Sequence, residues 1–447
     1  MYLYKNVEEL KADSKGILDL LGKDVKVLDG VKLSGELIDK IISTAVFSDN
    51  AELKSFLYGL VKSLAINRGA PPASIAGLYK AASKNVYSNK TVPAINLRGI
   101  TYDCARAVFR AAMKNKVGAF IFEIARSEID YTAQRPAEYA SCIFAAAIKE
   151  NYRGPVFIQG DHFQVSAKKY NANKEEEINK LKALIKEAIN AGFYNIDIDA
   201  STLVDLSQAT IEKQQEANSH NTAELTKFIR EIQPKGVLVS VGGEIGEVGK
   251  QNSRPEELRA FMSGYRALLS SNDIGLSKMS VQTGTTHGGV VLPDGSIAKV
   301  KLDFDTLKVL SKIAREEFGM AGAVQHGAST LPDEAFDKFP EVNTAEVHLA
   351  TGFQNIIFDH QNFPKGLTKQ IEEHLKSKHI DEKKPDQTDE QFIYSTRKKA
   401  FGPFKKELWG LTDKDLNTIM ASLEDRFSLI FRKLNIQDTV DVVRKTV

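Results

Sequence analysis

The chain has 447 residues, with 60 basic and 58 acidic side chains and a formal net charge of +2. This near balance gives no electrostatic reason to expect nucleic acid or an anionic membrane as a partner. The hydrophobic content of 42% and charged content of 26% are ordinary for a globular protein. One barrel of about 250 residues with additions at both ends would fit this length.

The two cysteines, Cys104 and Cys142, each lie in a helix-like apolar run, so a disulfide framework is not expected. The first residues lack the basic start and apolar stretch of a signal peptide. No apolar run reaches the roughly 18 residues that a membrane helix needs. We therefore expect a cytoplasmic protein.

Residues 1–90 are predicted to be a helical N-terminal extension and a candidate oligomerisation element. Apolar residues recur three and four positions apart over 33–46 and 53–66, which is typical of amphipathic helices. No strand-like alternation is evident in this part of the chain.

Residues 91–360 change character, because short β-branched runs alternate with longer amphipathic segments. The runs are Val92–Leu97, Ala119–Ile124, Val156–Gln159, Tyr194–Asp199, Val237–Val241, Met279–Gln282, Ala321–Gln325 and Glu346–Ala350. Eight strands alternating with helices predict an α/β fold, a (β/α)8 TIM barrel. An open doubly wound sheet is the alternative, but it predicts a glycine-rich loop after the first strand, and residues 96–103 do not form one.

The last part, residues 361–447, is predicted to be a charged loop followed by helices. Residues 361–394 are charged and loop-like, and 381–390 are expected to be mobile. Residues 395–447 return to a helical pattern.

Three histidines, His162, His287 and His326, lie in glycine-flanked motifs at predicted strand ends, and Glu244 has a matching setting. Active sites of TIM barrels assemble at the carboxyl ends of the strands. Three imidazoles bind Zn²⁺ well and leave a position for substrate. The pattern predicts a catalytic site for zinc or another divalent cation.

Such a metal can polarise a carbonyl and stabilise an enediolate, and the adjacent carboxylate Asp161 could move a proton. Backbone N–H groups at Gly288 and Gly327, with Ser329 nearby, could approach a phosphate closely. Thr351, after the eighth strand, could complete that phosphate pocket.

Simpler interpretations remain open. Any one of these histidines could be a hydrogen-bonded structural residue. Asp161 could merely orient a neighbouring imidazole, and Glu244 could be a solvated loop carboxylate. His348 could be a buried structural histidine or a substrate contact.

At these motifs, from about residue 92 to 410, the chain resembles the class II, zinc-dependent fructose- and tagatose-bisphosphate aldolases. The similar motifs are Gly160-Asp-His162, Asn195-Ile-Asp-Ile-Asp-Ala-Ser201, Glu244-Ile-Gly246, Gly284-Thr-Thr-His-Gly288, His326-Gly-Ala-Ser329 and Thr396-Arg-Lys-Lys-Ala-Phe-Gly-Pro403. The resemblance implies that Asp161 is the catalytic acid/base and that His162, His287 and His326 bind zinc. It also implies that Asp199 and Glu244 lie at alternative metal positions, so a second metal position is conceivable. A phosphorylated sugar substrate, a role in glycolysis and a homo-dimer or homo-tetramer are implied as well.

The chain departs from the family's pattern around the substrate. His348 replaces an asparagine that contacts the dihydroxyacetone phosphate part of the substrate, and Ala125 falls near a phosphate-binding serine. The loop after Glu244 lacks the family's usual run, so Glu247 is the candidate for the second proton-transfer carboxylate. These changes affect the choice of substrate more than the metal.

The leading hypothesis is a metal-dependent aldolase that cleaves or forms a ketose bisphosphate, such as fructose 1,6-bisphosphate, through an enediolate. One alternative is a sugar epimerase, or an aldolase for a sugar that is not a bisphosphate. Another is a non-catalytic partner subunit of a tagatose-bisphosphate aldolase.

Overall fold

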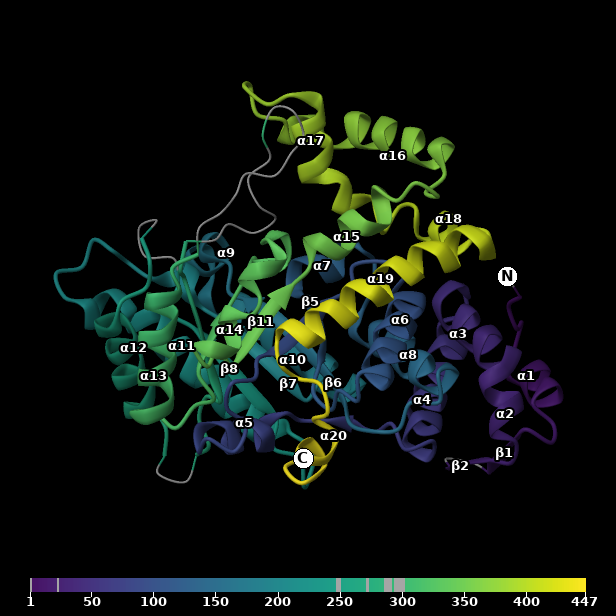
Figure 1. Cartoon of the computed structure of the whole chain (residues 1–447), viewed down its shortest axis with the longest axis horizontal. Coiled ribbons are helices and arrows are strands. Elements are labelled where there is room, and N and C mark those ends of the chain that lie inside the picture. Colours follow the sequence, from purple (N-terminus) through teal and green to yellow (C-terminus); the bar gives the residue numbers. More distant parts are fainter. Residues whose placement is uncertain (1, 22–23, 247–250, 271–272, 285–291, 293–301) are drawn as a thin grey trace.

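Eight parallel strands close into a barrel at the centre of the molecule (Figure 1). The computed structural model describes residues 2–21, 24–246, 251–270, 273–284, 292 and 302–447. The barrel strands are β4 (Val92–Asn96), β5 (Ile121–Ala125), β6 (Val156–Gln164), β7 (Asn195–Asp199), β8 (Ser240–Glu244), β9 (Lys278–Val281), β10 (Ala323–Gln325) and β11 (Glu346–Leu349). Each strand pairs with the next, and β11 pairs with β4. The predicted TIM barrel is confirmed.

The strands are almost wholly buried because helices cover the outside of the barrel. The elements between and after the strands are α6 (Thr101–Lys114), α7 (Arg126–Tyr131), α8 (Pro136–Lys149), α9 (Ala167–Ala172), α10 (Lys174–Ala191), η2 (Ser201–Leu203), α11 (Ile211–Ile232), α12 (Pro255–Ala267), α13 (Phe304–Glu316), η3 (Ala328–Thr330), η4 (Asp333–Ala335), α14 (Lys338–Glu341) and α15 (Thr351–Phe358). Charged side chains face outward on the long helices, and their buried residues are mainly apolar.

The described part of the N-terminal extension, residues 2–21 and 24–90, packs beside the barrel, with α3 and α4 against α8. Their elements are α1 (Val7–Asp13), β1 (Leu18–Leu21), β2 (Asp24–Val27), α2 (Gly30–Lys32), η1 (Leu33–Leu37), α3 (Ile38–Phe47), α4 (Ala51–Asn67), β3 (Pro72–Ala73) and α5 (Ala76–Ser83). The helices expected over 33–46 and 53–66 are present. The extension is not wholly helical, since β1 and β2 form an antiparallel pair and β3 adds to β6. Four-residue strands are too short to produce a recognisable alternation in the sequence.

The C-terminal part covers the barrel mouth and one of its sides (Figure 1). Its elements are α16 (Lys365–Lys378), η5 (Ile380–Glu382), α17 (Asp389–Thr396), η6 (Arg397–Ala400), α18 (Lys405–Trp409), α19 (Asp413–Lys433) and α20 (Val440–Arg444). The loop expected over 361–394 therefore contains a 14-residue helix, α16. Leu367, Ile371 and Leu375 form its buried stripe, which the surrounding charges obscure in the sequence. Nowhere in the described ranges does a helix combine the length and apolarity needed to cross a membrane.

Candidate metal and catalytic site

The Asp161-His162 pair lies in a β-bulge of β6. Gly160 and Phe163 stand opposite Ile196 and Ile198 of β7, so two residues of β6 face one residue of its partner. Side chains alternate across a regular strand, which would send neighbouring residues to opposite faces. The bulge, with His162 at a φ of +40°, lets both side chains reach the barrel mouth.

Gly160 is required by the packing beneath this bulge. A Cβ atom at Gly160 would lie 2.6 Å from the ring of Phe163. That ring is fully buried, so it has little room to move. The glycine of the Gly160-Asp161-His162 motif is thus needed because no side chain fits between the strand and the Phe163 ring.

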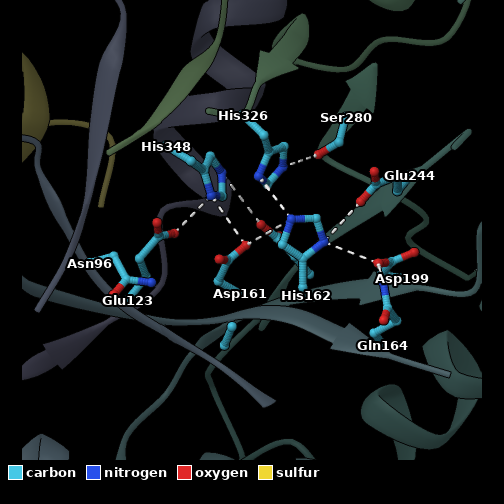
Figure 2. Close-up of polar contacts among 12 residues, drawn as sticks. Asn96, Glu123, Asp161, His162, Gln164, Asp199, Glu244, Ser280, His326 and His348 are labelled. Carbon is cyan, nitrogen blue, oxygen red and sulfur yellow. Dashed lines mark hydrogen bonds and ion pairs between the residues drawn. The ribbon is translucent and has the colours of Figure 1, made fainter. Parts of the chain in front are cut away.

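His162 and His326 point at each other across the mouth (Figure 2), with His162 Nε2 3.0 Å from His326 Nδ1. On the far side of the first ring, His162 Nδ1 lies 3.0 Å from Asp199 and 3.1 Å from Glu244. On the far side of the second, His326 Nε2 lies 3.0 Å from the Ser280 hydroxyl. Each imidazole is therefore oriented by a partner behind it, and its inner nitrogen faces the other ring.

The charges around His162 favour its protonated form when no cation is present. Burial alone would lower the His162 pKa, but Asp161, Glu244 and the hydrogen bond with Asp199 raise it well above the ordinary value. Burial raises the pKa of Glu244, as does the charge of Asp199. A positive charge is thus stabilised where these carboxylates converge, and a bound cation would supply one.

Asp161 lies beside His348, on the side of His162 away from Asp199 and Glu244. Its Oδ1 is 3.2 Å from His348 Nδ1 and 3.9 Å from His162 Nε2. His348 also contacts Glu123 at 2.9 Å and Glu346 at 2.7 Å, and its ring centroid lies 4.0 Å from that of His326. His348 is therefore both buried in a carboxylate cluster and part of the site wall (Figure 2).

Beneath the site, the barrel interior holds a buried ionic network that the sequence did not reveal. Lys278 Nζ lies 2.8 Å from both Asp197 and Gln159 and also contacts Glu346. Burial would raise the pKa of Glu346, but Lys278 and His348 lower it to about 2. Burial and the charge of Asp161 raise the pKa of Glu123 to about 8. The sequence feature that could have revealed this network is the presence of charged residues within otherwise apolar strands, as at Glu123 and Glu346.

A cavity of about 460 Å³ opens onto these side chains. Among the sequence-predicted site residues, it is lined by Asp161, His162, His326, Gly327, Ser329, His348 and Thr351. Asp199 and Glu244 lie behind His162 rather than on the cavity wall. His287, Gly288 and Glu247 fall outside the described residues.

Within the described residues, several groups of side chains could hold a metal ion. In one, His162, Glu244 and His326 each offer a ligand atom, and all three atoms lie within 4.8 Å of one another. Asp161, His326 and His348 form a second such group, and Glu123, Glu346 and His348 form a third. All three groups combine nitrogen and oxygen donors of the kind that Zn²⁺ binds.

A family model described as fructose-bisphosphate aldolase class-II matches residues 73–405, which span the barrel and the segment over its mouth. The chain belongs to this family. A search of curated proteins finds no significant match for this aldolase-family chain. The family membership agrees with the resemblance seen at the Asp161-His162 and His326 motifs.

Solved structures similar to this aldolase-family chain share its fold at low sequence identity. The fructuronate-tagaturonate epimerase of Cohnella laeviribosi has a TM-score of 0.58 and 14% identity, covering 85% of this chain and 86% of its own. A probable tagatose 6 phosphate kinase of Sinorhizobium meliloti 1021 has a TM-score of 0.53 and 15% identity, covering 77% and 97%. The fructose-bisphosphate aldolase of Campylobacter jejuni has a TM-score of 0.50 and 18% identity, covering 82% and 97%.

Proposed function

We propose that this protein is a divalent-metal-dependent aldolase that cleaves or forms a phosphorylated ketose through an enediolate. The observation that carries the proposal is the pair of inner nitrogens, His162 Nε2 and His326 Nδ1, which lie 3.0 Å apart at a cavity that Asp161 also lines. Membership of the class II aldolase family supports the same reaction class.

The donor set fits a zinc ion. Two nitrogens bonded to one tetrahedral Zn²⁺ at about 2.0–2.1 Å would lie roughly 3.3 Å apart, close to the separation of the inner nitrogens. The carboxylates behind His162 and the hydroxyl behind His326 fix the ring orientations, as the outer partners of metal-binding histidines do. His287, in the matching sequence motif, is the proposed third ligand. When bound, the cation would polarise the substrate carbonyl and stabilise negative charge on the enediolate.

Asp161 is the proposed base that takes the proton from the hydroxyl beside the scissile bond. It lines the cavity next to His162, within reach of a substrate held at the two imidazoles. His348 contacts the Asp161 carboxylate at 3.2 Å and so restricts its orientation. Glu247, outside the described residues, stays the candidate for the second proton transfer.

Part of the cavity wall suits a phosphate. Gly327, Ser329 and Thr351 line it; Gly327 and Ser329 belong to the turn around η3, and Thr351 is the first residue of α15. The Ser329 hydroxyl accepts a hydrogen bond from the Gly352 N–H at 3.1 Å, which brings the two loops together. The first backbone N–H groups of a helix favour an anion.

The test is an assay of retro-aldol cleavage of fructose 1,6-bisphosphate and tagatose 1,6-bisphosphate, before and after metal removal. We expect cleavage of at least one ketose phosphate that is lost with chelator and restored by zinc or another divalent ion. Cleavage that survives complete metal removal would overturn the proposed mechanism.

A sugar epimerase using the same enediolate is the second candidate. Asp161 and His348 are two proton-transfer groups 3.2 Å apart, and both line the cavity. An epimerase needs such groups to take a proton and return it. Product identification by NMR after incubation with phosphorylated and unphosphorylated ketoses decides: an epimer without triose products favours this candidate, and triose products favour the aldolase.

A further inference from the structure

The barrel interior connects the site with the opposite end of the barrel. Glu346 and His348 lie two residues apart on β11, so their side chains point to the same face of the strand, which is the barrel interior. Glu346 is the first residue of the strand, at the far end, and His348 lies nearer the mouth, where it lines the cavity. The proposed mechanism gives Glu346 and the residues below it no role.

Tyr79 reaches Glu346 from outside the barrel. It belongs to α5 in the N-terminal extension, and α5 lies at the end of the barrel opposite α16 and α17 (Figure 1). The Tyr79 hydroxyl donates a hydrogen bond to Glu346 Oε2, and both residues are almost wholly buried. Burial raises the Tyr79 pKa well above its ordinary value, and so does the charge of Glu346. The phenol therefore stays protonated at neutral pH and remains a donor.

Glu346 connects Tyr79 with His348. Its Oε1 lies 2.7 Å from His348 Nε2, accepts a hydrogen bond from Gln159 at 2.8 Å and contacts Lys278. Among the described residues, Tyr79 is the hydrogen-bond donor to the other oxygen, Oε2. Without the Tyr79 hydroxyl, one side of this buried carboxylate would lack its donor and the carboxylate could turn. Tyr79 therefore restrains the group that contacts His348.

His348 in turn contacts the proposed base. Its other ring nitrogen, Nδ1, lies 3.2 Å from Asp161 Oδ1 and 2.9 Å from Glu123. Figure 2 shows the imidazole between these two carboxylates. A change in the orientation of the ring would displace the Asp161 carboxylate, whose position relative to the substrate hydroxyl decides how well it takes the proton.

Helix α5 is itself anchored at the far end of the barrel. The backbone N–H of Ile75, just before the helix, donates to the side chain of Asn195 at 2.9 Å, and Asn195 is the first residue of β7. The C-terminal residues pack closely on the helix, since a Cβ atom at Gly77 would lie 1.9 Å from the carbonyl oxygen of Thr446. Both the barrel and the C-terminal residues therefore fix the helix that carries Tyr79.

We infer that Tyr79 is a positioning residue, which orients His348 and through it Asp161 from the end of the barrel opposite the site. The inference rests on the proposed function in taking Asp161 to be the base. It makes the N-terminal extension part of the catalytic machinery, because α5 supplies a side chain on which the site geometry depends.

The first measurement needs no turnover. The ring 15N signals of His348 are recorded in histidine-labelled wild type and Tyr79→Phe at matched metal content, and they are assigned by their absence from His348→Asn. We expect these signals to move in Tyr79→Phe by more than the line width. Tyr265→Phe is the matched control, since it removes an equally buried hydroxyl, bonded to Thr226, outside this network. Unmoved His348 signals in Tyr79→Phe would overturn the inference.

The second measurement is steady-state cleavage of the ketose phosphate that the wild type uses. We expect kcat of Tyr79→Phe to fall about five- to tenfold, as for the loss of one hydrogen bond, with KM within about twofold of wild type. Tyr265→Phe should keep both values. In the His348→Asn background, Tyr79→Phe should lower kcat no further, because its effect passes through His348. An equal fall in both backgrounds would indicate a purely structural role for Tyr79 and overturn the inference.

The reverse perturbation decides the question if Tyr79→Phe does not fold. A 3-fluorotyrosine placed at position 79 alone gives one 19F signal, which we expect to move in His348→Asn but not in His220→Asn, a change at an exposed histidine of α11. An unmoved signal in His348→Asn would contradict the inference. Coupled signals in a protein that cleaves no ketose would contradict the aldolase proposal alone, and cleavage without coupling would contradict this inference alone.

Discussion

Asp161 and His162 are neighbours in the chain, yet both side chains reach the barrel mouth because a bulge in β6 sets them opposite a single residue of β7. Asp161 turns towards His348, and His162 turns towards His326. The bulge therefore allows two consecutive residues, a proposed base and a proposed metal ligand, to serve the same site.

The first prediction concerns Gly160→Ala. The new Cβ would lie 2.6 Å from the Phe163 ring, so we expect the free energy of unfolding to fall by about 1–3 kcal/mol and zinc affinity to fall with it. Chemical denaturation and a zinc titration measure the two effects. Gly59→Ala is the control, because the exposed Gly59 has no atom within 4 Å of a Cβ and lies inside α4. Equal stability of Gly160→Ala and wild type would contradict the role of the bulge.

The second prediction concerns Asp161→Asn. Without the carboxylate the substrate hydroxyl has no base, so we expect kcat to fall by about 10²–10⁴-fold. Zinc content should stay at the wild-type level, since Asp161 is not one of the proposed zinc ligands and its carboxylate lies 3.9 Å from His162 Nε2. Steady-state kinetics and metal analysis of the same sample separate the two quantities. Turnover within a few-fold of wild type would remove Asp161 from the mechanism.

The third prediction concerns Asp199→Asn. Asp199 contacts His162 Nδ1 at 3.0 Å and is itself held by Gln164 and Ser201. Removal of its charge should weaken zinc binding by about 10–100-fold. Competition with a zinc chelator measures the affinity. Asp205→Asn, at an exposed turn, should bind zinc like the wild type. Equal affinities in the two variants would argue against His162 as a ligand.

The fourth prediction concerns Glu346→Gln and pH. Loss of this buried charge leaves Lys278 poorly compensated, so we expect about 3–5 kcal/mol of destabilisation at neutral pH. The folded-state pKa of Glu346, about 2, lies below its ordinary value of 4.5. Its contribution to stability is therefore complete above pH 4.5 and is lost as the pH falls towards 2.

The difference in unfolding free energy between wild type and Glu346→Gln should accordingly narrow across that window. Urea denaturation at a series of pH values measures it. Glu316→Gln removes an exposed charge paired loosely with Lys312 and should follow the wild type throughout. A difference that stays constant or widens on acidification would refute the assignment of a lowered pKa to Glu346.

All eight barrel strands could be predicted because buried parallel strands read as largely apolar runs, as Ala119–Ile124 does apart from Glu123. The convergence of His162 and His326 could also be predicted from the sequence, since the carboxyl ends of barrel strands meet at one face. Helix α16 was missed because its three-residue apolar stripe is embedded in charge.

The rest of the site depends on pairing in space rather than on local pattern. Nothing in the sequence around Lys278 or Glu346 indicates that they share one buried network with His348. The meeting of Tyr79 with Glu346 requires the N-terminal extension to pack at the far end of the barrel, which no periodicity encodes. The one sign of the bulge in the sequence is Gly160, the glycine before Asp161. A side chain at this position would collide with the Phe163 ring.

The most direct test of the central claim is the metal content of purified wild type and His326→Ala after dialysis against zinc and then metal-free buffer. The account predicts that wild type retains stoichiometric zinc and that His326→Ala, folded by circular dichroism, loses it, because His326 Nδ1 would no longer face His162 Nε2. Wild type that retains no more metal than His326→Ala would contradict the account.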